Sequence, residues 1–319
     1  MIIKKTYIIP VEGLEDVPSS IVSFSSELPN IFSITHKTHY HYSSPISFSK
    51  HLFRLQPEHN LIQSVLSHKF TVSAGTSEAY TFTEAFGNNA TFLEIKENYK
   101  DLNVVSESIV SVSQLPRKMQ IAHESRAIPL IWMPRDHLMM QGYLQAFDLP
   151  ESELLILAEY AMSFVDKHNH DVFEVLKDMN ETIYREYVYV PGSSTLETTP
   201  YEVYMSRKGV CQDFANLFIC LARLLGMAAR YRVGYVYTGG DYKNKIKSEA
   251  SHAWVEIYLP YLGWIGFDPT NGCLAEKNHI RVASGRSFQD AAPTSGTIFE
   301  LEEGVEETLN TSVQMILLS

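Results

Sequence analysis

The sequence contains few cysteines, few basic residues and no long apolar run. Its three cysteines, Cys211, Cys220 and Cys273, are too few for a disulfide framework in a chain of 319 residues. They favour a reducing compartment in which each is a free thiol. The 26 lysine and arginine residues against 37 aspartates and glutamates give a net charge of −11. This balance disfavours a nucleic-acid partner, because such proteins present a basic face.

Membrane-spanning and targeting segments are also missing from the sequence. No stretch reaches the roughly 20 apolar residues that cross a bilayer, and the N-terminus lacks the apolar run of about 7–15 residues of a secretory signal. We therefore expect a soluble, cytoplasmic protein without a membrane partner. Gly239-Gly240 is too weak a signal for a phosphate loop, and we expect no cofactor.

Alternation of apolar and polar residues predicts a β-rich accessory domain over residues 31–114. Residues 34–42 alternate with a period of two, and Gly87-Asn88-Asn89 is a turn signal between later strand candidates. Short strands at this spacing favour an antiparallel β-sandwich. We expect the polar residues 1–30 to form an N-terminal arm, and the proline-containing residues 115–150 to form a connector with short helical turns.

The second half of the chain has a mixed pattern and predicts an α+β core over residues 151–290. Apolar stripes at helical spacing predict helices over residues 154–165 and 172–183, with Asp171 as the N-cap of the second. Residues 291–319 are expected to form a C-terminal, strand-like tail.

Three histidines in the first predicted strand are candidate metal ligands. His39 and His41 share a strand face that a metal could use, and His36 lies nearby in sequence. No second pair of ligands is defined, so we interpret all three as ordinary strand histidines and expect no metal.

Cys211 lies at the predicted start of a strongly amphipathic helix. Apolar residues recur at helical spacing over residues 214–225, and Gly226 stands where a C-cap glycine is expected. In the first turn, free N–H groups and the helix dipole stabilise a thiolate and offer donors to an oxyanion. The alternative is a small apolar core residue. That interpretation suits Cys220 in the middle of the helix, and Cys273 has no assigned role.

A predicted hairpin brings a histidine and a carboxylate onto one face of a sheet. The segments on either side of the turn alternate in polarity, and an odd-numbered loop puts His252 and Asp268 on the same side. A turn centred on Pro260 would place them directly opposite, whereas one centred on Tyr261 would make them diagonal neighbours at roughly 7–8 Å. An even loop would separate them. The imidazole would take the proton of the Cys211 thiol, and the carboxylate would orient the imidazole.

Four blocks of the sequence resemble the bacterial transglutaminase-like cysteine hydrolases. They are GVCQDFA at 209–215, GMAARYRVGY at 226–235, SHAWVEIYLP at 251–260 and GWIGFDPTNG at 263–272. Residues 34–55 are similar to the N-terminal β domain that accompanies this core in many bacterial members, and residues 285–293 resemble a segment downstream of the core.

The resemblance implies a papain-like α+β fold in which the nucleophile helix packs on an antiparallel sheet. Cys211 matches the family's nucleophile, His252 its base and Asp268 its orienting carboxylate. All three are intact, which disfavours a degenerate pseudoenzyme. The family's second oxyanion donor cannot be assigned from this sequence.

The resulting hypothesis is acyl transfer through a thioester, with water releasing the acid from a peptide or protein amide substrate. A transamidase would use the same acyl-enzyme with an amine as acceptor. A binding module, with the β domain gripping a partner, is an alternative of another class, and a metal held by Cys211, His252 and Asp268 is a third. Residues 238–250 are equally well interpreted as a lid or as a plain loop. Substrate identity and oligomeric state stay open.

Overall fold

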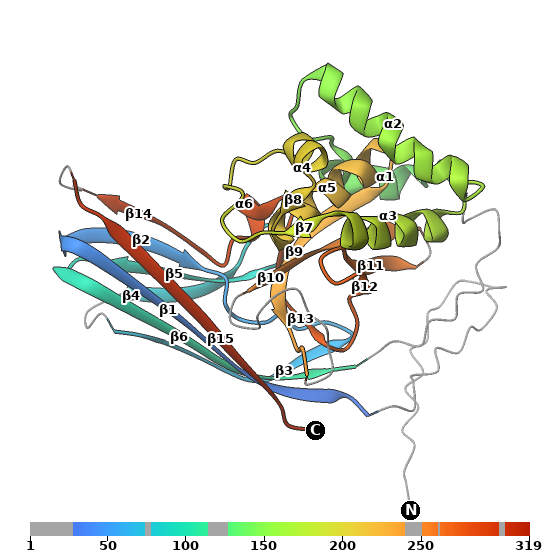
Figure 1. Ribbon diagram of the computed structural model, residues 1–319. Helices are drawn as coiled ribbons and strands as arrows, with labels where there is room; N and C mark the ends of the chain where they lie inside the picture. Colours follow the sequence, from blue (N-terminus) through green and yellow to red (C-terminus); the bar gives the residue numbers. More distant parts are fainter. Residues whose placement is uncertain (1–27, 74–77, 114–126, 240–250, 261, 300–303) are drawn as a thin grey trace, which may run out of the picture.

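The fold is given by a computed structural model that describes residues 28–73, 78–113, 127–239, 251–260, 262–299 and 304–319 (Figure 1). The expected arm up to residue 27, the first part of the expected connector and most of the expected lid lie outside these residues. The described part contains antiparallel sheets from the first half of the chain and a mixed core from the second. The α+β class predicted from the sequence is therefore confirmed.

Two sheets of four strands each form a β-sandwich within the described residues. The first has the strand order β15-β1-β6-β3, with bounds Glu307–Leu317, Asn30–Ile46, Tyr99–Val112 and Gln63–Val72. The second has the order β14-β2-β5-β4, with bounds Thr294–Phe299, Phe48–Phe53, Asn89–Ile95 and Glu78–Thr83. Alternate side chains of β1, β2, β5 and β6 meet in an apolar core that includes Tyr42, Phe53 and Leu93.

The two C-terminal strands return to the sandwich built by the N-terminal half. β14 pairs antiparallel with β2, and β15 pairs antiparallel with β1 over residues 307–317. Figure 1 shows these red strands lying beside the blue ones, so the two ends of the chain share one domain. Each C-terminal strand is thus the edge strand of one of the two sheets.

The mixed core is a five-stranded antiparallel sheet covered by helices. Its order is β12-β11-β10-β9-β13, with bounds Cys273–Leu274, Gly263–Asp268, His252–Leu259, Ala228–Val236 and His279–Gly285. The helices are α1 (Pro134–Leu144), α2 (Glu151–Lys167), α3 (Val172–Glu186), α4 (Pro200–Ser206), α5 (Cys211–Leu224) and α6 (Phe288–Ala291). A short parallel pair joins β7 (Val188–Tyr189) to β8 (Lys208–Gly209). Helix α5 packs on β9 and β10 in the main apolar cluster.

The helices follow the apolar periodicity of the sequence. Helices α2, α3 and α5 cover the three predicted helical segments, and Asp171 caps α3 by accepting hydrogen bonds from the N–H groups of Phe173 and Glu174. Gly226 follows α5 with a φ of 75°, the left-handed conformation that a C-cap glycine adopts readily. Among the described residues, no helix combines the length and apolar character needed to cross a membrane.

Two amide side chains of the sandwich bind the edge of the five-stranded sheet. Gln63 donates to the carbonyl of Arg281 at 2.7 Å and accepts from its N–H at 2.8 Å. Asn88 makes the same pair of bonds with Ser284, at 2.8 and 2.7 Å. Both partners lie on β13, an edge strand whose free backbone groups are satisfied in this way. These contacts fix the sandwich against the sheet that carries His252.

A buried charge cluster joins the same two parts of the molecule. Glu256 on β10 is 1% exposed and accepts hydrogen bonds of 2.7 Å from each of three arginines, Arg230, Arg232 and Arg281. Arg232 also forms an ion pair with Glu58, which lies in the chain between β2 and β3. Three cations around one carboxylate hold the pKa of Glu256 well below its usual range, although burial alone would raise it.

Candidate active site

Cys211 is the first residue of α5, with its side chain partly exposed. The preceding residue, Val210, is extended, and its N–H donates to the carboxylate of Asp213 at 2.7 Å. The hydroxyl of Ser194 donates to the same oxygen at 2.5 Å. A side chain at Gly209 would stand 2.7 Å from the Asp213 side chain, so this close turn requires glycine. The thiol is therefore held at a helix N-terminus, as the sequence predicts.

His252 and Asp268 meet at one end of the five-stranded sheet. The hairpin of β10 and β11 pairs Val255 with Phe267, the register of a turn centred on Tyr261, so His252 and Asp268 are diagonal neighbours. His252 Nε2 lies 2.8 Å from Asp268 Oδ2. The two side chains are 2% and 0% exposed, so the hydrogen bond is shielded from water.

The three predicted site residues are coupled electrostatically. Burial opposes the charged form of His252, but the carboxylate of Asp268 and the sulfur of Cys211 outweigh it and raise its pKa to about 10. His252 Nδ1 is buried and has no hydrogen-bond partner within normal distance among the described residues. The ring therefore has one nitrogen bound to the carboxylate and its other nitrogen unbound in the described part of the chain.

Asp268 is fixed by a ring of donors. Its Oδ1 accepts from the N–H groups of Thr270 and Asn271 at 3.1 and 3.2 Å, and its Oδ2 accepts from the side-chain amide of Asn271 at 2.7 Å. Burial would raise the pKa of Asp268, but the two neighbouring histidines more than offset this and lower it well below its usual range. The carboxylate is thus ionised and held in one orientation by its donors.

The comparisons with known proteins cover both parts of the chain. Residues 158–269 match the transglutaminase-like superfamily, and residues 32–111 match the bacterial transglutaminase-like N-terminal region. An uncharacterized protein of Mycobacterium tuberculosis is 32% identical over 298 residues, which are 89% of this chain and 92% of that protein. The chain belongs to the transglutaminase-like superfamily.

Two further proteins are similar to the chain. A candidate cysteine protease of Cytophaga hutchinsonii has a crystal structure that superposes with a TM-score of 0.72 at 22% identity, covering 92% of each chain. This likeness shows the fold. A protein-glutamine gamma-glutamyltransferase of Pseudomonas aeruginosa is 24% identical over 147 residues, which are 45% of this chain and 19% of that protein.

The transglutaminase-like core contains a second histidine that the sequence reasoning missed. His279, at the start of β13, places its Nε2 3.1 Å from Asp268 Oδ2, the oxygen that also binds His252. Burial lowers the pKa of His279, so the ring is neutral and donates its Nε2–H to the carboxylate. The available signal is that His279 begins an alternating strand eleven residues after Asp268. This signal predicts the contact with Asp268 only once the pairing of the strands is known.

Trp254 fills the space between the two histidines. It is fully buried, and its ring lies 6.0 Å from that of His252 and 5.3 Å from that of His279. A Cβ at Gly234 on β9 would stand 2.6 Å from the indole and 1.9 Å from a carbonyl oxygen of β13. The glycine therefore makes room for the tryptophan, which keeps water away from the histidines.

The other two cysteines occupy different surroundings. Cys220 is fully buried in α5, and burial raises the pKa of its thiol to about 12. Cys273 is partly exposed and lies near Asp268 and His279, with one potential metal-ligand atom of each within 4.8 Å of the others. Since Asp268 already accepts hydrogen bonds on both oxygens, a metal there would have to displace some of its donors.

The three strand histidines lie apart from this site. His36 is buried and hydrogen-bonds to the hydroxyl of Tyr235 at 2.9 Å. His39 and His41 do share a face, and both bind one oxygen of Asp101, at 3.0 and 2.8 Å.

Proposed function

We propose that this protein is a cysteine hydrolase that cleaves peptide or protein amides. In this proposal Cys211 is the nucleophile, His252 the general acid and base, and Asp268 the group that orients the imidazole. The observation that carries it is the buried 2.8 Å hydrogen bond between His252 and Asp268, on an imidazole whose pKa is raised by that carboxylate and further by the sulfur at the start of α5.

The proposed reaction has two halves that share one thioester. The sulfur of Cys211 attacks the amide carbonyl carbon, the C–N bond breaks, and the imidazolium of His252 gives its proton to the leaving amine. A water molecule then attacks the thioester while His252 takes up its proton. The acid leaves and the thiol is restored. Free N–H groups in the first turn of α5 would stabilise the oxyanion of both tetrahedral intermediates.

Transamidation is the second candidate reaction. It uses the same thioester, but an amine replaces water in the second half. The partial similarity to a protein-glutamine gamma-glutamyltransferase favours this outcome, whereas the similarity in fold to a candidate cysteine protease favours hydrolysis. We propose hydrolysis as the main reaction, with transamidation as the alternative.

A cytoplasmic location is part of the proposal. It is supported by the three cysteines, none of which is part of a disulfide. Fractionation of the native host with thiol trapping tests it, since a protein found only in an oxidising compartment would contradict it.

A peptide-library cleavage profile tests the proposed function. We expect wild-type protein to cleave a subset of peptides and the Cys211→Ala variant to cleave none. Adding excess primary amine during the time course distinguishes the two reactions. Free acid as the main product supports hydrolysis, and a dominant amine adduct would show that the enzyme is a transamidase.

A further inference from the structure

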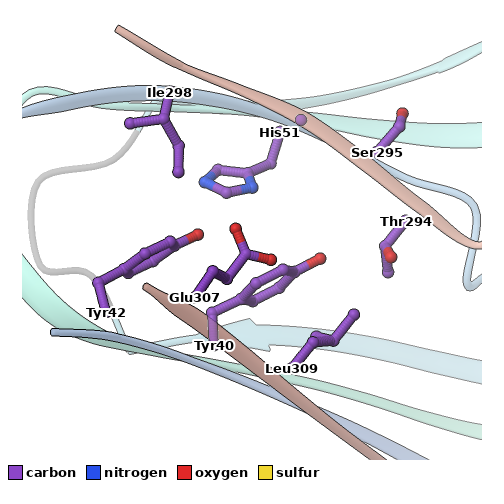
Figure 2. Close-up of a pocket in the computed structure, with 9 residues that line it drawn as sticks. Tyr40, Tyr42, His51, Thr294, Ser295, Ile298, Glu307 and Leu309 are labelled. Carbon is purple, nitrogen blue, oxygen red and sulfur yellow. The ribbon is translucent and has the colours of Figure 1, made fainter. Parts of the chain in front are cut away.

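A cavity of about 430 Å³ lies in the β-sandwich, outside the catalytic core. It opens between the edge strands β14 and β15, with β1 and β2 behind them. Figure 2 shows the side chains that line it, and none of them comes from α5, β10 or β11. Its volume is within the roughly 300–1,000 Å³ usual for small-ligand sites.

Aromatic rings form the walls of this cavity. Tyr40 and Tyr42 on β1 are 6% and 1% exposed, and their rings are parallel within 5° with centroids 6.5 Å apart. His51 on β2 faces Tyr40 with a centroid distance of 5.6 Å. Burial lowers the pKa of His51 to about 4, so this ring is neutral at physiological pH. The walls thus offer π faces and no positive charge.

One carboxylate enters the cavity from β15. Glu307 pairs directly with Tyr42 in the antiparallel register, so the two side chains share the inner face of the sheet. In Figure 2 the carboxylate of Glu307 points into the space beneath His51, with the tyrosine rings on either side. Burial raises the pKa of Tyr40 and of Tyr42, and the charge of Glu307 raises both further. The charge of the carboxylate is therefore close enough to both rings to interact with them electrostatically.

No cation of the described chain neutralises this carboxylate. Glu307 forms no ion pair with a described residue, and neither lysine nor arginine is among the described residues that line the cavity. The strand opposite His51 carries Gly296, and a Cβ there would stand 2.9 Å from the imidazole. A glycine inside a strand often marks a place where a ligand approaches, and here it keeps the cavity open beside the rings.

We propose that this cavity binds an alkylammonium group, either that of a small amine or that of a lysine side chain. A cation is attracted by the faces of aromatic rings and by a carboxylate, and each attraction strengthens where water is partly excluded. Anions are disfavoured by Glu307. A neutral ligand of the same shape would gain only from apolar contact. The site is separate from Cys211, so it stands or falls independently of the proposed hydrolase activity.

Matched pairs of probes test the charge requirement by calorimetry and ligand-observed NMR on the full chain. Choline is compared with its neutral isostere 3,3-dimethylbutan-1-ol, and Nα-acetyl-lysine methylamide with Nα-acetyl-norleucine methylamide. We expect at least one cation to bind about tenfold more tightly than its neutral partner. The pair that shows the difference identifies a small ammonium compound such as choline or a lysine side chain as the source. Equal affinity within both pairs, or no saturable binding by either cation, overturns the proposal.

Two neighbouring substitutions locate the binding. Glu307→Gln removes the charge inside the cavity, at a side chain exposed enough to be changed without loss of the fold, and should weaken binding of the preferred cation about tenfold. Glu306→Gln makes the same change at an exposed residue that does not line the cavity and should leave affinity unchanged. Unfolding curves verify that both variants fold. Unchanged affinity in Glu307→Gln, or equal losses in both variants, would contradict the site.

Discussion

His279 donates a hydrogen bond to the Asp268 oxygen that also holds His252. The two distances to Oδ2 are 3.1 Å from His279 and 2.8 Å from His252, and all three side chains are almost completely buried. This hydrogen bond joins His279 to Asp268 and not to Cys211. Its position behind the carboxylate points to a role in orienting Asp268, and through it the imidazole of His252.

Replacing His279 should reduce the rate without changing substrate affinity. His279→Leu removes the donor to Asp268 at similar volume, and we expect kcat to fall about 10–100-fold with KM unchanged. His279→Gln keeps one N–H donor and should recover part of the loss. Steady-state kinetics with the substrate found by the peptide library measures both. Wild-type kcat in the leucine variant, or equal rates in the two variants, would argue against the positioning role.

Asp268→Asn should shift the pH profile as well as the rate. Asp268, with a smaller contribution from the sulfur of Cys211, outweighs burial and raises the pKa of His252 from 6.5 to about 10, so the imidazolium persists to alkaline pH in the wild type. Without the carboxylate the imidazolium loses its proton at lower pH, and the alkaline limb of kcat/KM should move down. The rate should fall about 10⁴-fold, as for other triads that lose this charge. An alkaline limb at the wild-type position would refute this coupling.

Cys211 and Cys273 form a matched pair of alanine substitutions. Cys211→Ala removes the proposed nucleophile, and amide cleavage should fall about 10⁴-fold or more. Cys273 lies beside Asp268 and His279 but is not the proposed nucleophile, so Cys273→Ala should keep wild-type kcat within a few-fold. Cleavage assays on both variants distinguish the two thiols. The reverse pattern would make Cys273 the nucleophile and His279 its base.

Glu256→Gln should destabilise the fold. The substitution leaves two buried arginines, Arg232 and Arg281, and the partly buried Arg230 without their shared carboxylate, a loss of about 3–5 kcal/mol in the free energy of unfolding. Glu159→Gln on the exposed face of α2 is the control and should change it by no more than about 0.5 kcal/mol. Urea unfolding at neutral pH measures both.

The same charge cluster has a defined pH dependence. The folded pKa of Glu256 is lowered, so its contribution is present above its unfolded value of 4.5 and is lost as the pH falls through the folded value. The difference between the wild type and Glu256→Gln should therefore shrink only at strongly acid pH. A difference already lost near neutral pH would contradict the lowered pKa.

The local parts of the site could be predicted from the sequence. The apolar period of α5 located Cys211 at a helix start, and strand parity put His252 and Asp268 on one side of a hairpin. The sequence pattern is compatible with two turn centres, Pro260 and Tyr261. Only the observed register, centred on Tyr261, decides between them, because turn geometry and not side-chain alternation sets the register.

The long-range parts could not be predicted in this way. His279 lies on β13, which pairs with β9, and Asp268 lies on β11, so β9 and β10 stand between the two strands in the sheet. No local pattern encodes that strand order. The same holds for β14 and β15, which pair with strands more than 200 residues earlier in the chain. The hydrogen bonds of Gln63 and Asn88 to β13 also depend on this packing, since each side-chain amide is satisfied by backbone groups about 200 residues later in the chain.

Time-resolved alkylation of the three thiols tests the central claim, that Cys211 is activated by its surroundings, most directly. Native protein is treated with iodoacetamide at neutral pH, and peptide mass spectrometry follows Cys211, Cys220 and Cys273; a sample in urea gives their rates without the fold. We predict that Cys211 reacts first in the native protein, that Cys220 stays protected by burial, and that all three react alike in urea. Native Cys211 reacting no faster than Cys273 would contradict the account.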